Sequence, residues 1–251
     1  MHGLKKLMIA SGFAFAALGG GAQAADMTQP FLEPILPVEV ASSWYLRGDI
    51  GYKMYTTPNA AYSSLVQGYY DYYNIDLDNS WTIGGGVGYQ FNPWFRADLT
   101  VDYSAQASYS SRLTCFIACN GALYTEDAGK ISTWAILANA YVDLGTWAGI
   151  TPYVGGGIGA ANVRLSDYSG YYALPPFNPV ATVAANSSQW NFAWAVTAGA
   201  SIDMTDVLLL DLNYRYLAVG DVSTADQYGG KIEVNDIASH EFRVGLRYMI
   251  N

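Results

Sequence analysis

Polar and apolar residues alternate along much of the chain after Trp44. The clearest stretch is Phe95–Tyr103, in which every odd position is apolar and every even position is polar. The same alternation occurs in Leu210–Tyr216 and in Glu241–Tyr248. Because successive side chains of a strand point to opposite faces, this pattern predicts β-strands whose two faces meet different surroundings.

Five further segments predict strands of the same kind, which makes eight in all. They are Trp44–Met54, Ser80–Phe91, Ile131–Leu144, Thr151–Val163 and Trp190–Met204. Each has roughly the 9 to 11 residues, or a few more, that a tilted strand needs to cross a bilayer. Glycine runs at residues 84–86 and 155–157 suit a narrow barrel that bends or has a crowded interior.

The connections between these segments are alternately short and long. Short turns are predicted at Asn92-Pro93, Gly145–Gly149 and Thr205-Asp206. Long loops are predicted at Tyr55–Asn79, Ser104–Lys130, Arg164–Gln189 and Ala218–Ser239. Bacterial outer-membrane barrels have short periplasmic turns and long extracellular loops, and an even strand number returns both termini to the periplasm. The sequence therefore predicts an all-β protein, an eight-stranded antiparallel up-and-down transmembrane β-barrel.

Composition favours the same architecture. Charged residues make up 13% of the chain and aromatic residues 15%, whereas soluble domains have about 25% charged residues. The aromatic residues cluster at the two predicted membrane interfaces, with Trp44, Phe91, Trp94, Trp147 and Tyr248 near the turns and Trp81, Tyr103, Trp134, Trp190, Tyr216 and Phe242 near the loops. Such girdles are typical of membrane barrels. The alternative explanation is the aromatic core of a soluble β-sandwich.

The first 24 residues have the organisation of a secretory signal peptide. Lys5 and Lys6 precede an apolar run from Leu7 to Leu18, and small residues surround a cleavage site at Ala24. The apolar run is shorter than the roughly 20 residues of a membrane-spanning helix. We expect a signal peptide at residues 1–24, a proline-containing periplasmic lead-in at residues 25–43 and the barrel at residues 44–251.

The charge pattern describes the barrel interior. Without Lys5 and Lys6 the chain has 10 basic and 21 acidic residues, a net charge of −11, which argues against a nucleic-acid partner. If the apolar phase faces lipid, six cations and seven anions point inward: Arg47, Asp49, Lys53, Arg96, Asp98, Asp102, Asp143, Asp203, Asp211, Arg215, Glu241, Arg243 and Arg247. An eight-stranded barrel has room only for side chains, and buried charges must be paired. We expect a lumen plugged by salt bridges, and a narrow channel is the alternative.

Catalytic motifs are scarce. Apart from His2 in the leader, the chain has only His240, which stands beside Glu241 near the end of the last strand. A Ser-His-carboxylate hydrolase would depend on this histidine, and no G-x-S-x-G elbow occurs. We therefore expect a non-enzymatic protein with no catalytic, cofactor or metal residues, and keep a lipid-modifying enzyme as a lesser alternative.

The two cysteines lie close together in the second predicted loop. Cys115 and Cys119 are separated by three residues. Because an exported chain passes through an oxidising compartment, we expect them to form a disulfide that closes a small ring. A metal site would need further histidine or cysteine ligands nearby, and the sequence offers none.

The predicted loops are rich in tyrosine, which gives a large contact area at low entropic cost. The tyrosines are Tyr62, Tyr69, Tyr70, Tyr72, Tyr73, Tyr168, Tyr171 and Tyr172. They favour recognition of an extracellular or host-surface ligand. The alternative is that they simply rest on the barrel rim or the lipid headgroups.

Four segments resemble the alphaproteobacterial outer-membrane surface-antigen proteins, a group within the opacity-protein-like porins and OmpA-type transmembrane barrels. They are Trp44–Tyr52, Thr151–Gly157, Tyr214–Leu217 and Val244–Tyr248. The resemblance implies an eight-stranded barrel that contributes to envelope integrity or adhesion or, in some members, binds haem.

The end of the chain departs from the family pattern. Such barrels generally end in an aromatic residue that the barrel-insertion machinery recognises, whereas Met249-Ile250-Asn251 follow Tyr248 here. We also expect no peptidoglycan-binding domain after the eighth strand. The expected partners are outer-membrane lipid and lipopolysaccharide, the insertion machinery and an extracellular ligand, which includes haem or another small ligand bound by the tyrosine-rich loops.

Overall fold

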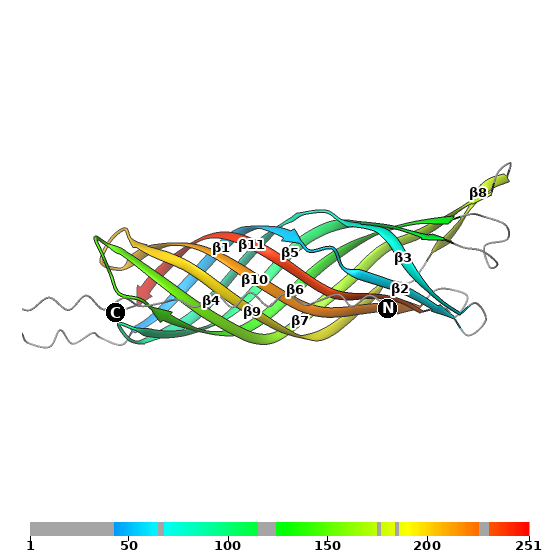
Figure 1. Cartoon of the computed structure of the whole chain (residues 1–251). Coiled ribbons are helices and arrows are strands. Elements are labelled where there is room, and N and C mark those ends of the chain that lie inside the picture. The colour runs from blue at the N-terminus through cyan, green and yellow to red at the C-terminus, as the bar shows by residue number, and fades with distance from the viewer. Residues whose placement is uncertain are drawn as a thin grey trace, which may run out of the picture. The chain divides into compact units, whose positions relative to one another are not determined.

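Eight long strands close into a ring. A computed structural model describes residues 43–64, 68–114, 124–174, 177–183, 186–225 and 231–250. The ring strands are β1 (Ser43–Tyr55), β4 (Ser80–Asn92), β5 (Phe95–Thr114), β6 (Tyr124–Asp143), β7 (Ile150–Leu174), β9 (Ser187–Asp203), β10 (Leu208–Ala225) and β11 (Lys231–Ile250). Each pairs antiparallel with the next, and β1 pairs with β11 to close the ring (Figure 1). The predicted eight-stranded antiparallel barrel is confirmed.

Some predicted features lie outside the described residues. These are the signal peptide at residues 1–24, the lead-in up to residue 42 and the pair Cys115 and Cys119. In the part of the chain that the structure describes, no helix is long and apolar enough to cross a membrane.

The short turns fall where the sequence predicted them, and polar side chains hold two of them. At the turn between β4 and β5, the Asn92 side chain accepts a hydrogen bond from the Trp94 backbone N–H at 2.9 Å. Between β9 and β10, the Thr205 hydroxyl accepts from the Leu208 N–H at 3.0 Å. Such side chain-to-backbone bonds mimic a backbone turn and fix the strand pair.

The prediction of long loops is wrong over most of these segments, because the strands continue through them. β5 and β6 stay paired up to Thr114 and Tyr124. The connection between β1 and β4 forms a hairpin of β2 (Asn59–Ser64) and β3 (Gly68–Leu77), which inserts between β11 and β5. β8 (Phe177–Val183) pairs with β7.

A β-bulge explains why the alternation of polar and apolar residues that begins at Phe95 does not continue in the same phase through the rest of β5. The register of β5 and β6 shifts between Ser104 and Ala107. Before the shift the even residues of β5 are buried, as at Asp102, and after it the odd ones are, as at Tyr109. A bulge adds one residue and so exchanges the two faces of the strand.

The barrel has two regions with opposite polarity. We call the first the belt region, made of β1, β4, 95–104, 134–143, 150–161, 190–203, 208–217 and 240–250. The second, which we call the extension, is made of β2, β3, β8, 105–114, 124–133, 162–174, 187–189, 218–225 and 231–239. In Figure 1, β2, β3 and β8 lie at the end of the barrel opposite to the C-terminal end of β11.

The outer wall of the belt region is apolar and bordered by aromatic rings. Exposed rings at the turn end are Trp44, Phe91, Trp94, Trp147 and Tyr248, and those near the extension are Trp81, Trp134, Trp190 and Phe242. Residues such as Ile50, Leu99 and Val196 are exposed between them. Both predicted girdles therefore lie on the outer wall, with Tyr103 and Tyr216 half-buried.

The extension has an apolar core and a polar outer wall. Its buried core residues include Ala60, Leu77, Ala107, Tyr109, Ile131, Val163, Leu165, Tyr168, Val219, Val222, Ile232, Val234 and Ile237. The core continues through Leu137 and Leu217 into the part of the belt region that adjoins the extension. The extension is thus packed like a water-soluble β-protein, whereas the belt region is not.

Candidate functional site

The interior of the belt region holds six cations and six carboxylates. Of the thirteen residues predicted to point inward, twelve are each at most 8% exposed: Arg47, Asp49, Lys53, Arg96, Asp98, Asp102, Asp143, Asp211, Arg215, Glu241, Arg243 and Arg247. Asp203, the other residue predicted to point inward, is the last residue of β9, and its side chain is exposed beside the turn. Its cross-strand partner Leu209 pairs in turn with inward-facing Arg247, so Asp203 lies on the inner face at the end of the barrel.

Asp102 forms the centre of a continuous network. Its carboxylate accepts hydrogen bonds from Arg215 Nη1 at 2.8 Å and from Arg243 Nη2 at 2.7 Å. Arg215 also pairs with Glu241 at 2.7 Å through Nη2. Lys53 Nζ lies 3.6 Å from Glu241 Oε1. Charge-assisted bonds of this kind offset the cost of removing the ions from water.

Asp49 extends the network to a second cluster. Its carboxylate lies 3.5 Å from Arg243 Nη2 and 2.8 Å from Arg47 Nη2. Arg47 in turn donates to Asp98 at 2.9 Å and to the Tyr141 hydroxyl at 3.0 Å. Eight of these twelve residues are therefore joined in one chain of contacts.

Two further pairs lie beside this chain. Arg96 Nε lies 3.1 Å from Asp143 Oδ1, and Arg247 Nε lies 3.3 Å from Asp211 Oδ2. The Arg96 guanidinium stands 4.3 Å from the ring centre of Tyr141 and 4.3 Å from that of Tyr153. Aromatic rings on a guanidinium provide cation–π stabilisation in a buried site.

Sequence reasoning missed the neutral polar members of this interior. The Tyr45 hydroxyl donates to Asp98 at 3.1 Å, Asn139 Nδ2 donates to Asp98 at 2.8 Å, and the Ser201 hydroxyl donates to Asp211 at 2.8 Å. The phase of alternation could have found them, because Tyr45 is in the same phase as Arg47.

Glycines make room for these side chains. A Cβ atom at Gly84 would overlap the Asp102 carboxylate, and one at Gly88 would overlap the Tyr45 ring. The glycine-rich segment of β4 therefore serves the polar interior, as expected for a crowded barrel.

The lone histidine is separated from the carboxylate beside it. His240 Nδ1 lies 2.6 Å from the Tyr214 hydroxyl on the outer wall, whereas Glu241 is fully buried inside. The two adjacent residues lie on opposite faces of β11 and form no dyad. Among the described residues, no group of three His, Cys, Asp or Glu side chains could hold a metal ion.

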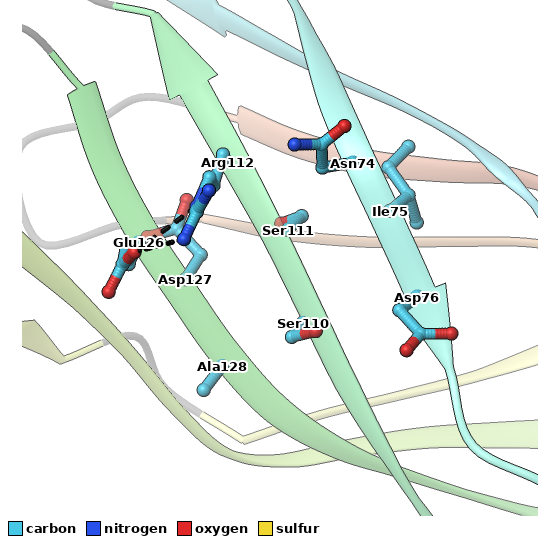
Figure 2. A pocket seen from close by; sticks show the side chains of 9 residues that line it. All are labelled: Asn74, Ile75, Asp76, Ser110, Ser111, Arg112, Glu126, Asp127 and Ala128. Carbon is cyan, nitrogen blue, oxygen red and sulfur yellow. Dashed lines mark hydrogen bonds and ion pairs between the residues drawn. The ribbon is translucent and has the colours of Figure 1, made fainter.

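The extension presents a hollow on its outer wall. A pocket of about 690 Å³ is lined by Asn74, Ile75, Asp76, Ser110, Ser111, Arg112, Glu126, Asp127 and Ala128 of β3, β5 and β6. Figure 2 shows Arg112 and Glu126 joined on one side of the pocket and the β3 residues on the other. Arg112 Nη2 lies 2.7 Å from Glu126 Oε1. Seven of its nine lining residues have polar or charged side chains.

Of the eight predicted loop tyrosines, only Tyr73 and Tyr168 have side chains that the structure describes, and their surroundings differ. Tyr168 is 5% exposed and belongs to the apolar core, whereas Tyr73 is 39% exposed. In the core, burial raises the pKa of the Tyr109 hydroxyl to about 12, so this side chain is neutral at physiological pH. Part of the tyrosine content therefore stabilises the extension.

Comparisons with known proteins agree with this architecture. A family model described as an outer membrane protein beta-barrel domain matches residues 12–249. An uncharacterized protein of Brucella suis is 36% identical over 267 residues, covering 90% of this chain and 92% of its own. A putative adhesin of Rickettsia bellii is 25% identical, covering 82% of each chain. The crystal structure of OprG from Pseudomonas aeruginosa is similar in fold, with a TM-score of 0.51 and 14% identity over 84% of this chain and 97% of its own.

Proposed function

Because the chain belongs to the outer membrane protein β-barrel domain family, we propose that it is a non-enzymatic surface barrel with a closed lumen. The belt region crosses the outer membrane. The extension stands outside the cell, where its polar wall contacts external surfaces and contributes to envelope integrity or adhesion. The turns between β4 and β5, β6 and β7, and β9 and β10 then face the periplasm.

The reversal of polarity between the two regions supports the placement of the belt region in the membrane and of the extension in water. Lipid requires an apolar outer wall, and water requires a polar one. In β5, the exposed residues are Leu99 and Val101 in the belt region and Ser108 and Ser110 in the extension. The strand thus leaves the membrane between these two pairs.

The balanced interior supports a closed lumen. Six cations and six carboxylates are buried in the belt region, and an eight-stranded barrel has no space for a water-filled channel beside its side chains. The expected measurement is an absence of discrete conductance steps in planar bilayers that contain the purified barrel. Reproducible steps with ion selectivity would overturn the closed lumen.

An adhesive role is supported by the polar side chains that line the pocket on β3, β5 and β6 and by the similarity to a putative adhesin. Cells that display the protein are expected to bind host-cell surfaces better than cells that lack it. Substituting Arg112 and Asp76 together, in the pocket of Figure 2, tests whether this wall is responsible. Equal binding by cells with and without the protein would remove adhesion from the proposal.

The orientation is tested by labelling in intact cells. Ser110→Cys on the extension and Asp206→Cys at a turn are placed in a background with Cys115 and Cys119 replaced by serine. A membrane-impermeant maleimide is expected to label Ser110→Cys in intact cells and Asp206→Cys only after permeabilisation. The reverse pattern would contradict the proposed orientation.

A further inference from the structure

A second hollow lies on the outer wall where the belt region meets the extension. This pocket of about 570 Å³ is lined by residues of β5, β6, β7 and β9. They are Tyr103, Gln106, Ser132, Trp134, Asn162 and Arg164, with Ser166, Asp167, Asn186, Ser187 and Ser188. Its position places it at the level where lipid headgroups meet the barrel, if the belt region lies in the membrane.

The sheet register arranges its outer wall in three rows. Ser132, Arg164 and Ser188 are direct cross-strand partners on β6, β7 and β9. Two residues nearer the belt, the row is Trp134, Asn162 and Trp190, and the third row is Ile136, Ala160 and Phe192. Since alternate residues of a strand are roughly 7 Å apart, the rows form steps of cationic-polar, aromatic and apolar character.

Arg164 differs from the other exposed cations of the extension. Arg112 pairs with Glu126, Lys130 pairs with Asp167 and Lys231 pairs with Glu233. Arg164 is exposed and forms no ion pair with any residue that the structure describes. Of its two cross-strand neighbours, Ser132 has a hydroxyl that can add a hydrogen bond to an anion that Arg164 attracts, whereas the Ser188 hydroxyl donates to Asn162.

The second row has two exposed tryptophan rings on which a sugar can pack. Trp134 is 50% exposed and Trp190 is 61% exposed. Asn162 lies between them and accepts a hydrogen bond from the Ser188 hydroxyl at 2.9 Å. Tryptophan rings at an interface combine an apolar face with a polar edge, and a pyranose ring presents both characters.

We propose that this pocket binds a phosphorylated glycolipid of the outer leaflet. Its phosphate contacts Arg164 and the hydroxyl of Ser132, its sugar rests on Trp134 and Trp190, and its acyl chains run along the third row. The inference rests on the proposed function, because it requires the belt region to lie in the membrane and the extension to stand outside.

The rows favour a lipid over a soluble polyanion. A soluble polyanion would be held by a broad set of cations, and Arg164 is the unpaired cation of this pocket among the described residues. The adjoining row is apolar, since Ile136 is 39% and Phe192 is 65% exposed. One phosphate above apolar surface matches the order of groups in a glycolipid.

The test uses purified full-length mature protein, folded in dodecyl maltoside micelles, with diphosphorylated lipid A as the probe and native mass spectrometry as the readout. Arg164→Gln is expected to weaken lipid A binding about tenfold, as loss of one charge-assisted contact does. Arg112→Gln, which removes an exposed arginine from the ion pair with Glu126, is the matched control and is expected to change binding less than about twofold.

Two further arms separate the possible ligands. Dephosphorylated lipid A is expected to bind the unaltered protein about as weakly as lipid A binds Arg164→Gln. Trp134→Ala is expected to weaken the binding of lipid A and to leave the binding of a sulfated oligosaccharide unchanged. Equal affinity of Arg164→Gln and the unaltered protein for lipid A overturns the inference, and so does binding of the oligosaccharide alone.

Failure of this inference can be told apart from failure of the proposed function. Heat-dependent gel mobility first shows that each variant is a folded barrel. If maleimide labelling gives the proposed orientation but Arg164→Gln binds lipid A normally, only the glycolipid site is wrong. If the labelling pattern is reversed, the proposed function is wrong and the pocket lies at the other leaflet.

Discussion

The belt region and the extension are built from the same strands but are packed in opposite ways. In the belt region the wall is apolar and the interior contains paired ions, as in the contacts of Asp102 with Arg215 and Arg243. In the extension the interior is apolar and the wall carries charges such as Arg112 and Glu126. The solvent outside each region decides which residues a β-barrel can place within it.

The stability of the two regions depends on different interactions. If the wall of the belt region meets lipid, as proposed, this region gains little from an apolar interior. Its stability then depends on the pairing of the buried ions. The extension depends on burying apolar side chains away from water. Substitutions should therefore have opposite consequences in the two regions.

The largest effect is expected from an unpaired ion in the belt region. Asp102→Ala leaves Arg215 and Arg243 without their shared carboxylate and is expected to lower the free energy of unfolding by about 3 to 5 kcal/mol. Urea unfolding in micelles, followed by tryptophan fluorescence, measures it. Glu126→Gln in the extension breaks an exposed ion pair and should cost less than about 1 kcal/mol. Equal losses in the two variants would contradict the comparison.

A cavity in the extension should come next. Leu165 is 1% exposed in the apolar core, and Leu165→Ala is expected to cost about 3 kcal/mol by loss of transfer free energy and by the cavity that remains. Limited proteolysis should then cut the extension faster while the belt region stays protected. If the belt region is cut equally fast, the two regions unfold as one unit, and the expected difference in their stability is contradicted.

A lysine on the outer wall distinguishes the two surroundings with the smallest effect. Leu99 and Ser108 are both exposed on β5. Leu99→Lys in lipid bilayers is expected to cost about 2 to 3 kcal/mol, because the charge enters the apolar layer. Ser108→Lys is expected to change stability by less than about 0.5 kcal/mol. Similar costs at both positions would place them in the same medium.

The sequence predicted the belt region well because one rule applies throughout it. Arg96, Asp98 and Asp102 alternate with apolar residues in an unbroken phase, and their charges made the inner face obvious. The same rule did not distinguish the buried charges from Asp203, which is the last residue of β9 and is exposed at the end of the barrel.

The extension could not be predicted in the same way. Its inner residues are often small or weakly polar, such as Ala107 and Ser111, so they resemble loop residues. The bulge after Ser104 also exchanges the two faces of β5, and no local residue pattern announces that shift. The hairpin of β2 and β3 becomes a pair of strands only through its contacts with β11 and β5, which are far away in the sequence.

The candidate sites were predictable to different degrees. The inner ion network followed directly from the strand phase. The row of Ser132, Arg164 and Ser188 required the register of three strands, because these residues are separated by more than twenty positions along the chain. Sequence reasoning had placed Arg164 in a loop, where no cross-strand neighbours could be assigned.

The most direct test of the central claim is the medium around successive outward residues of one strand. Spin labels are placed at Val101, Ser108 and Ser110 of β5 in liposomes, in a background with Cys115 and Cys119 replaced by serine. The account predicts that the Val101 label collides more with oxygen, which concentrates in lipid, and that both serine labels collide more with a water-soluble nickel chelate. The same preference at all three positions would contradict the account.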